Sequence, residues 1–391
     1  MFVFVLATVM VINLVGLVMV LSASSVSALY EYGSSWFLFK RQLLWMGLGI
    51  VAMFVVMRVD YHWWRRRTNF ILIGTGLLMA LVLVPGLGVN VNGSSRWLGY
   101  GILRIQPSEF AKLGVLLFVA DLLARRADKV DNWRVTLQPV LVVFVVFAAM
   151  LLAQPNLGTT IVLGAIVFVM LFVGGVAIKP LGITFAVGAV SATLLAMIES
   201  YRWRRLKGFI DPWKDAANTG YQTIQSQVAI AHGGVTGSGL GQSRAKYGFL
   251  PFAHTDFIFA IISDELGMIG ALLVVALFIA LCVAGIRTAL QAPDRYGMLL
   301  ATGITSWILI QAFVNIGAVV GVLPITGVPL PFVSYGGSSL LVMMAAVGLL
   351  LSVARQARPV RPVRATGPAR STRQSRSTGP VRPVRQARKA R

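Results

Sequence analysis

The run FIFAIISDELGMIGALLVVALFIALCVAGI, residues 257–286, indicates what kind of protein this chain forms. Asp264 and Glu265 are its only charged residues. A membrane-spanning helix needs about 20 consecutive, mainly apolar residues. The run is therefore long enough to cross a bilayer, and its two acids need a role or partners inside the protein.

Comparable apolar runs lie on both sides of this one. They predict an all-α, polytopic membrane protein of about ten transmembrane helices within residues 1–354. The first run is interpreted as a retained span, because no small-residue cleavage site with a soluble domain follows it. The predicted spans are Phe2–Leu21, Leu38–Met57, Phe70–Leu87, Phe110–Ala124, Leu137–Leu152, Thr159–Ile178, Leu181–Ile198, Phe257–Ile286, Met298–Leu323 and Ser338–Ala354.

The composition agrees with a membrane protein. Of 391 residues, 57% are hydrophobic and 12% are charged, whereas soluble domains carry about 25% charged residues. The net charge of +22 could suggest a nucleic-acid binder. The basic residues instead lie between apolar runs and in the tail, so we expect no nucleic-acid partner. The single cysteine, Cys282, excludes a disulfide framework and a cysteine-based metal site.

The distribution of Lys and Arg predicts the orientation. Most basic residues between runs fall on the side of the N-terminus, which predicts N-in and C-in, with a large extracytoplasmic loop at residues 200–255. Residues 355–391 are basic without any acid, and their composition predicts a disordered cytoplasmic tail. This tail either fixes the topology or docks a partner or anionic lipids.

The first polar segment, residues 90–112, is predicted to face outward. Arg96 and Trp97 suit an interfacial anchor. Glu109 and Lys112 are three residues apart on one helix face. They could form a local ion pair at a capped helix start, yet Lys112 lies a full turn inside an apolar span, where an ammonium is costly without a partner or a function.

The second polar segment is the long outer loop. Its start interleaves Arg202, Arg204, Arg205 and Lys207 with tryptophans, a mixture that suits lipid headgroups and would attract a phosphate. Further on, five glycines fall within residues 233–241. They could cradle an anion through backbone N–H groups, or they could simply make the loop flexible. The side chains that would join such a cradle are those of Ser243, Arg244 and Lys246.

The long loop ends at Asp256, next to the predicted eighth span. This residue could only cap the helix, or it could be a functional carboxylate at the membrane–water boundary. Asp264 and Glu265 lie two turns deeper, and either Lys112 or Arg41 could be their partner. The third polar segment, residues 323–339, contains three prolines, so its non-helical backbone predicts one wall of an outward pocket.

Four motifs resemble the SEDS family (shape, elongation, division and sporulation), which includes FtsW and RodA. They are IQPSEFAKL at 105–113, QPNLGTT at 154–160, GSGLGQSRAKYGFLPFAHTDFIFAIISDELG at 237–267 and GVPLPFVSYGGSSL at 327–340. The long-loop motif and the serines near residue 22 resemble the FtsW branch more than RodA. The family usually has aspartate where this chain has Asn156.

This resemblance implies a peptidoglycan glycosyltransferase that uses lipid II at the outer face of the bacterial cytoplasmic membrane, in septal wall synthesis. It also implies a class B penicillin-binding protein and other divisome membrane proteins as partners. Asp256 corresponds to the family's essential acid, and its supporting polar residues map onto Arg41, Arg96, Trp97, Glu109 and Lys112.

The chemistry of such an enzyme needs few groups. The resemblance implies a single inverting displacement, for which Asp256 would be the general base. A departing pyrophosphate needs positive charge, which Arg96, Lys112, Arg244 and Lys246 could supply. A divalent cation (Mg²⁺ or Mn²⁺) could bridge the pyrophosphate and an acid, although no motif requires a metal.

Three other functions fit parts of the sequence. A lipid-precursor flippase or transporter could have the same helices, but its binding acids are expected near the bilayer midplane. A non-enzymatic scaffold would not need Asp256 and the cations of the outer loop. A RodA-like polymerase of the lateral wall would share the chemistry and differ only in its cellular site.

Overall fold

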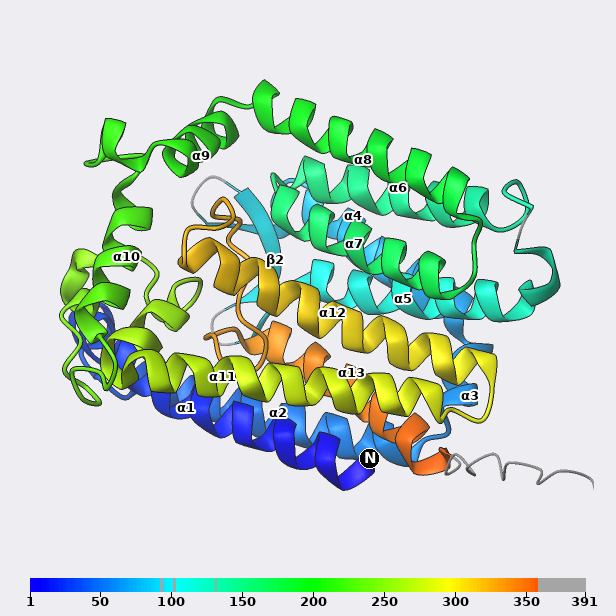
Figure 1. Cartoon of the computed structure of the whole chain (residues 1–391), viewed down its shortest axis with the longest axis horizontal. Coiled ribbons are helices and arrows are strands. Elements are labelled where there is room, and N and C mark those ends of the chain that lie inside the picture. The colour runs from blue at the N-terminus through cyan, green and yellow to red at the C-terminus, as the bar shows by residue number, and fades with distance from the viewer. Residues whose placement is uncertain (92–93, 101–102, 131, 358–391) are drawn as a thin grey trace, which may run out of the picture. The chain divides into compact units, whose positions relative to one another are not determined.

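The computed structural model describes residues 1–91, 94–100, 103–130 and 132–357. The fold is mostly helical (Figure 1), and most of the predicted tail lies outside the described residues. The α-helices are α1 (Phe2–Tyr32), α2 (Phe37–Arg58), α3 (Tyr61–Arg66), α4 (Thr68–Leu83), α5 (Pro107–Arg125), α6 (Leu137–Ala153), α7 (Leu157–Val173), α8 (Ile178–Ile198), α9 (Ser200–Ile210), α10 (Tyr221–Gly233), α11 (Ile258–Leu290), α12 (Arg295–Val319) and α13 (Gly337–Gln356).

Six of these helices, in the described part of the chain, are long and apolar enough to cross a membrane. They are α1, α2, α8, α11, α12 and α13, while α4, α6 and α7 are shorter apolar helices. The helix α5 carries four charged residues and corresponds to the remaining predicted span. Each predicted span therefore falls on a helix, while the number of membrane crossings stays a prediction.

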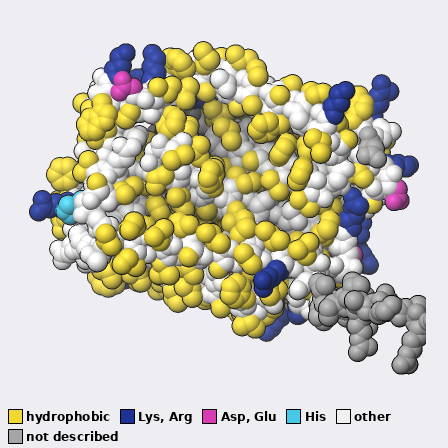
Figure 2. Space-filling model, in the orientation of Figure 1, with side chains coloured by type: hydrophobic (Ala, Val, Ile, Leu, Met, Phe, Trp, Pro, Cys, Tyr) yellow, Lys and Arg dark blue, Asp and Glu magenta, His cyan; other side chains and the backbone are white. Residues whose placement is uncertain are grey.

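The helices run side by side, and the long loop lies at one end of them. In Figure 1, α9 and α10 are at that end, whereas Met1, α3 and the end of α13 are at the other. Figure 2 shows hydrophobic side chains over the middle of the visible face and most Lys and Arg toward its ends. A lipid-embedded surface has this distribution. Which end faces the cytoplasm stays a prediction.

Packing within the bundle is uneven. Helix α12 is central, and Trp307 on it is fully buried. The helix α8 has only one buried side chain, that of Leu181. An apolar helix with so little packing has to be covered by lipid or by a partner.

One part of the fold departs from the all-α prediction. Strands β1 (Gly88–Val91), β2 (Ser94–Tyr100) and β3 (Leu103–Ile105) form a small antiparallel sheet in the order β1-β2-β3. The all-α prediction included no strands in this segment. The sheet matters because β2 carries Arg96 and Trp97.

The long outer loop is largely structured. It contains α9, a 3₁₀ helix at Pro212–Asp215, α10 and a π-helical turn at Ala245–Phe249. Helix α10 lies directly before the glycine-rich residues 233–241. The glycine-rich stretch of the loop packs against α11, where the N–H groups of Ser238 and Gly239 donate to the carbonyl oxygens of Asp264 and Glu265. These two N–H groups are thus bonded within the protein.

The predicted eighth span is a broken helix. Within α11, Gly267 has φ 65° and ψ −167°, and the N–H of Met268 donates to the carbonyl of Gly234. A Cβ at Gly267 would come within 2.3 Å of the backbone nitrogen of Gly237. The backbone of the long loop therefore occupies the break, and only glycine fits there.

The buried acids of α11 pair with the long loop instead of with Lys112 or Arg41. The carboxylate of Asp264 accepts from Ser243 at 2.5 Å and lies 2.7 Å from His232 Nδ1. Glu265 lies 3.3 Å from Lys246 Nζ and accepts from Ser22 of α1 at 2.6 Å. These contacts anchor the glycine-rich stretch to α11 and α1.

We predict that Lys246→Met lowers the free energy of unfolding by about 3 kcal/mol or more, because it leaves the buried Glu265 carboxylate without its cation. Arg244→Met is the matched control, since Arg244 is an exposed cation two residues away. Thermal unfolding of both purified variants in the same detergent measures the difference. Equal melting temperatures for the two variants would contradict the prediction.

Candidate active site

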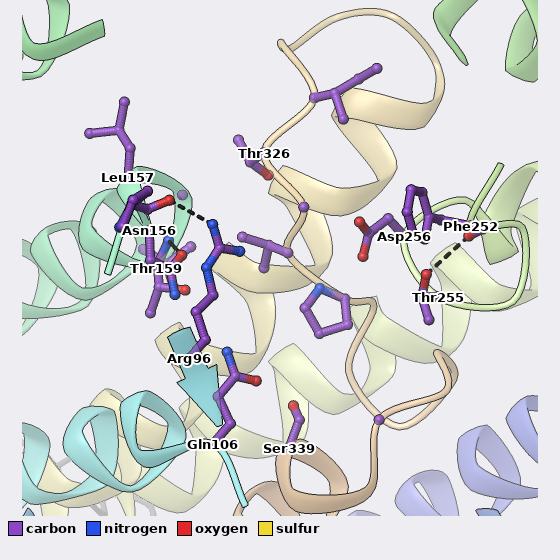
Figure 3. A pocket seen from close by; sticks show the side chains of 18 of the residues that line it. Arg96, Gln106, Asn156, Leu157, Thr159, Phe252, Thr255, Asp256, Thr326 and Ser339 are labelled. Atoms are coloured by element: carbon purple, nitrogen blue, oxygen red, sulfur yellow. Dashed lines mark hydrogen bonds between the residues drawn. The ribbon is translucent and has the colours of Figure 1, made fainter. Parts of the chain in front are cut away.

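A cavity of about 1080 Å³, lined by several charged side chains, opens at the end of the helices where α9 and α10 lie. Its walls come from β2, the starts of α5 and α7, the end of α8, α9, and the segments before α11 and α13. Figure 3 shows part of this lining. The predicted site residues that line it are Arg41, Arg96, Trp97, Glu109, Lys112 and Asp256.

The backbone around Asp256 is held from two directions. Asn315 of α12 donates its Nδ2 to the carbonyl of Asp256 at 2.8 Å and to that of Val328 at 2.9 Å. Ser334 donates its hydroxyl to the carbonyl of Thr255 at 2.6 Å. These bonds join the end of the long loop to the proline-rich segment, and the Asp256 carboxylate points into the cavity (Figure 3).

The environment of Asp256 makes it a better base than an ordinary aspartate. Burial raises the pKa of its carboxyl to about 6, against the charges of Arg205 and Arg96, which lower it. His254 also lines the cavity, but burial lowers the pKa of its imidazole to about 4. At neutral pH, Asp256 is mainly ionised and His254 is neutral. Asp256 is therefore the stronger of these two bases.

Arg96 approaches the cavity from the other side. Its Nε donates to the carbonyl of Gln154 at 3.1 Å, and its Nη2 donates to that of Pro155 at 2.6 Å. Figure 3 shows Arg96 and Asp256 extending toward the same space from opposite walls. The two bonds fix a guanidinium in position, which is how a preorganised anion site is built.

Asn156 follows Gln154 and Pro155, the two residues that hold Arg96, and is the N-cap residue of α7. Its Oδ1 accepts from the backbone N–H of Thr159 at 3.3 Å, so the side chain caps the helix. Asparagine and aspartate are about equally good at this position. The replacement of the family's usual aspartate therefore preserves the cap.

Glu109 and Lys112 form a buried ion pair in the wall of the cavity. Glu109 Oε1 lies 2.8 Å from Lys112 Nζ, with the side chains 3% and 2% exposed. The ammonium also donates to Gln311 of α12 at 2.9 Å, and Ser339 of α13 donates to the carboxylate at 3.3 Å. The local ion pair that the sequence allows is confirmed, and it joins three helices beneath the cavity.

Three predicted residues lie away from the cavity. Ser243 and Lys246 are buried against the acids of α11, and the exposed Arg244 is not part of the lining. Their placement gives no support to the predicted role in binding pyrophosphate, because the two buried groups already bond to carboxylates.

The sequence analysis assigned no role to Asn315, which holds the backbone of Asp256, and placed Arg205 only in a basic run that suits headgroups or a phosphate. Asn315 lies inside a predicted span, where a side-chain amide was a usable signal. In the described residues, no group of three or more His, Cys, Asp or Glu side chains could hold a metal ion. A cation bound jointly with a substrate pyrophosphate stays a prediction.

The fold and cavity define a class: polytopic helical membrane proteins with a cavity at one end of the helices, where Asp256 lies within the electrostatic influence of two arginines. A family model described as cell cycle protein, for FtsW, RodA and SpoVE, matches residues 2–359. The chain belongs to this family.

Known relatives cover most of the chain. Stage V sporulation protein E of Bacillus subtilis strain 168 is 46% identical over 346 residues, which are 88% of this chain and 94% of the relative. A probable peptidoglycan glycosyltransferase FtsW of Geobacter metallireducens is 43% identical over 343 residues, 86% of this chain and 90% of the relative.

Solved structures share the fold. One is a chain from a peptidoglycan synthase complex that coordinates polymerization and crosslinking. It is 30% identical with a TM-score of 0.74, over 90% of this chain and 96% of that one. Another is an aspartate-to-alanine mutant of the rod shape determining protein RodA of Thermus thermophilus. It is 28% identical with a TM-score of 0.69, over 90% of this chain and 97% of that one.

We predict strong coupling between Glu109 and Lys112. Glu109→Gln or Lys112→Met alone should each lower the free energy of unfolding by about 3–5 kcal/mol, since each leaves one buried charge unpaired. The double variant Glu109→Gln/Lys112→Met should recover a large part of that loss. Thermal unfolding of the four proteins tests this cycle, and additive losses would show that the two side chains do not act as a pair.

Proposed function

We propose that this protein is a peptidoglycan glycosyltransferase that polymerises lipid II at the outer face of the bacterial cytoplasmic membrane. One observation carries the proposal: Asp256, with its pKa raised to about 6, points into the cavity, and the charges of Arg96 and Arg205 act on it. The activity named for the FtsW relative supports it.

The reaction needs a base on one side of a sugar ring. A hydroxyl of the acceptor sugar attacks the anomeric carbon of the donor and loses its proton to Asp256. General-base catalysis is most effective when the pKa of the base lies near the working pH. A pKa of about 6 meets this condition better than the ordinary value of 3.8.

The donor's leaving group is a pyrophosphate, which departs without needing a proton. Fixed cations stabilise the charge that develops on it. Arg96 is one such cation, because two backbone carbonyls hold its guanidinium in place before substrate binds. An α-linked donor then gives a β-linked product in a single inverting displacement.

A lipid-precursor transporter is the competing function, and the break in α11 is the feature that favours it. The loop backbone fills that break, so it does not line a path through the protein. The two buried acids just before the break, Asp264 and Glu265, bond to His232, Ser243 and Lys246. We therefore favour the transferase.

The proposed partners are a class B penicillin-binding protein and other divisome membrane proteins, and the proposed place of action is the division septum. The solved synthase complex supports the first. The FtsW relatives support the second. Depletion in the native cell tests it: filaments with unfinished septa are expected, whereas rounded cells that still divide would indicate lateral-wall synthesis.

We predict that Asp256→Asn lowers glycan polymerisation at least about 10²-fold, because the amide cannot accept the hydroxyl proton. The assay incubates purified protein, with and without its partner, with fluorescent lipid II and separates the glycan chains on a gel. Asp128→Asn removes an exposed carboxylate far along the chain and should keep full activity. Wild-type activity in a folded Asp256→Asn protein would refute Asp256 as the base.

We also predict a pH dependence with a defined sign. Because burial raises the pKa of Asp256 to about 6, the carboxylate is protonated below that pH. The value of kcat/KM should therefore rise as pH increases through about 6 and level off near 7. A pH series of initial rates measures the midpoint, and a midpoint near 4 would mean that the carboxyl titrates as an exposed aspartate.

A further inference from the structure

Helix α9 presents one face to the cavity. Arg202, Arg205 and Leu206 line the cavity, and they follow the i, i+3 and i+4 spacing of a single helix face. Arg204 and Lys207 are exposed and are not part of the lining. The four cations of this basic run thus form two groups: Arg202 and Arg205 line the cavity, whereas Arg204 and Lys207 face away from it.

Arg205 faces Asp256 across Gly327. A Cβ placed on Gly327 would lie 3.6 Å from Asp256 Oδ2 and 4.0 Å from Arg205 Nη1. Gly327 has no side chain and a φ of +72°, which favours glycine. The carboxylate and the guanidinium therefore border the same small space, and the charge of Arg205 lowers the pKa of Asp256.

Two of the other cations that line the cavity are held by closer partners. Lys112 is buried against Glu109, and Arg96 donates short bonds to two carbonyls. Arg205 is exposed, and its bond to the carbonyl of Ile325 is 3.4 Å long. An exposed guanidinium in the wall of a cavity is accessible to a phosphate, with which it forms charge-assisted hydrogen bonds.

We propose that Arg205 is a catalytic residue that takes up the negative charge of the donor's departing pyrophosphate, with Asp256 as the base on the opposite face of the anomeric carbon. This proposal rests on the proposed glycosyltransferase function and adds a residue to it. An inverting displacement needs the base and the leaving-group stabiliser on opposite faces of the sugar, with room between them. Asp256 and Arg205 border the cavity near Gly327, where no side chain comes between them.

The acceptor hydroxyl oxygen forms a bond to the anomeric carbon, and its proton moves to the Asp256 carboxylate. The bond from the anomeric carbon to the pyrophosphate oxygen breaks, and its electron pair stays on that oxygen. The guanidinium of Arg205 donates hydrogen bonds to the oxygen as the charge develops. The proton then leaves Asp256 for water.

The test compares Arg205→Ala and Arg205→Lys with the matched control Arg204→Ala, on the same helix but outside the cavity lining. Arg205→Ala should lower kcat for lipid II polymerisation by about 10²–10³-fold with little change in KM, as removal of a transition-state contact does. Arg205→Lys should recover part of kcat, and Arg204→Ala should stay within about 3-fold of wild type.

The pH profile provides a second readout, which a structural role would not change. Without the positive charge of Arg205, the pKa of Asp256 should rise, so the midpoint of activity should move to higher pH. Arg205→Lys should keep the wild-type midpoint because it keeps the charge. If Arg205→Ala does not purify as a folded protein, the pH profile and kcat of Arg205→Lys are compared with those of Arg204→Ala. Full activity of Arg205→Lys would then overturn the need for a guanidinium.

Two failures are distinguishable. If the wild-type protein with its partner makes no glycan from lipid II, the proposed function fails. If the wild type polymerises and Asp256→Asn does not, but Arg205→Ala keeps kcat within about 3-fold, only the role of Arg205 fails. A raised KM with unchanged kcat would also overturn it, because that result describes uniform binding of substrate and transition state.

Discussion

The whole site depends on how the backbone around Asp256 is held. A single amide, that of Asn315, donates to the carbonyls of Asp256 and Val328 and thereby joins the end of a long loop to a proline-rich segment. Irregular backbone near a membrane has to find such partners, since lipid offers none. The same bonds that satisfy the two carbonyls direct a carboxylate into the cavity. The hydrogen bonds of Asn315 therefore serve both the stability of the fold and the position of the proposed base.

Two buried ion pairs support this arrangement from different sides. Glu109 and Lys112 join α5 to α12 under the cavity, while Glu265 and Lys246 fix the glycine-rich stretch to α11. Both pairs consist of charges that would be costly alone in a low-dielectric interior. Their partners make them structural elements, and they leave the cavity arginines as the cations that face a substrate.

The sequence predicts the helices well because a bilayer imposes a simple rule of length and apolarity. It also brings Asp256, Arg96, Glu109 and Lys112 to one cavity, since polar residues at span ends have few other places to lie. The predicted site role of Ser243 and Lys246 finds no support, because they bond to Asp264 and Glu265, 21 and 19 residues further along the chain. Loop packing of that kind has no periodic signal, and the small sheet around Arg96 was missed for the same reason.

The break in α11 also affects how the outer connection tolerates change. Outer loops usually accept insertions because their backbone is solvated. Here the backbone of residues 234–239 replaces missing helix hydrogen bonds at Gly267. The number of residues in this stretch is therefore constrained, because its backbone groups must align with those of α11. Epitope tags for topology mapping belong near the exposed Trp213 rather than among the glycines.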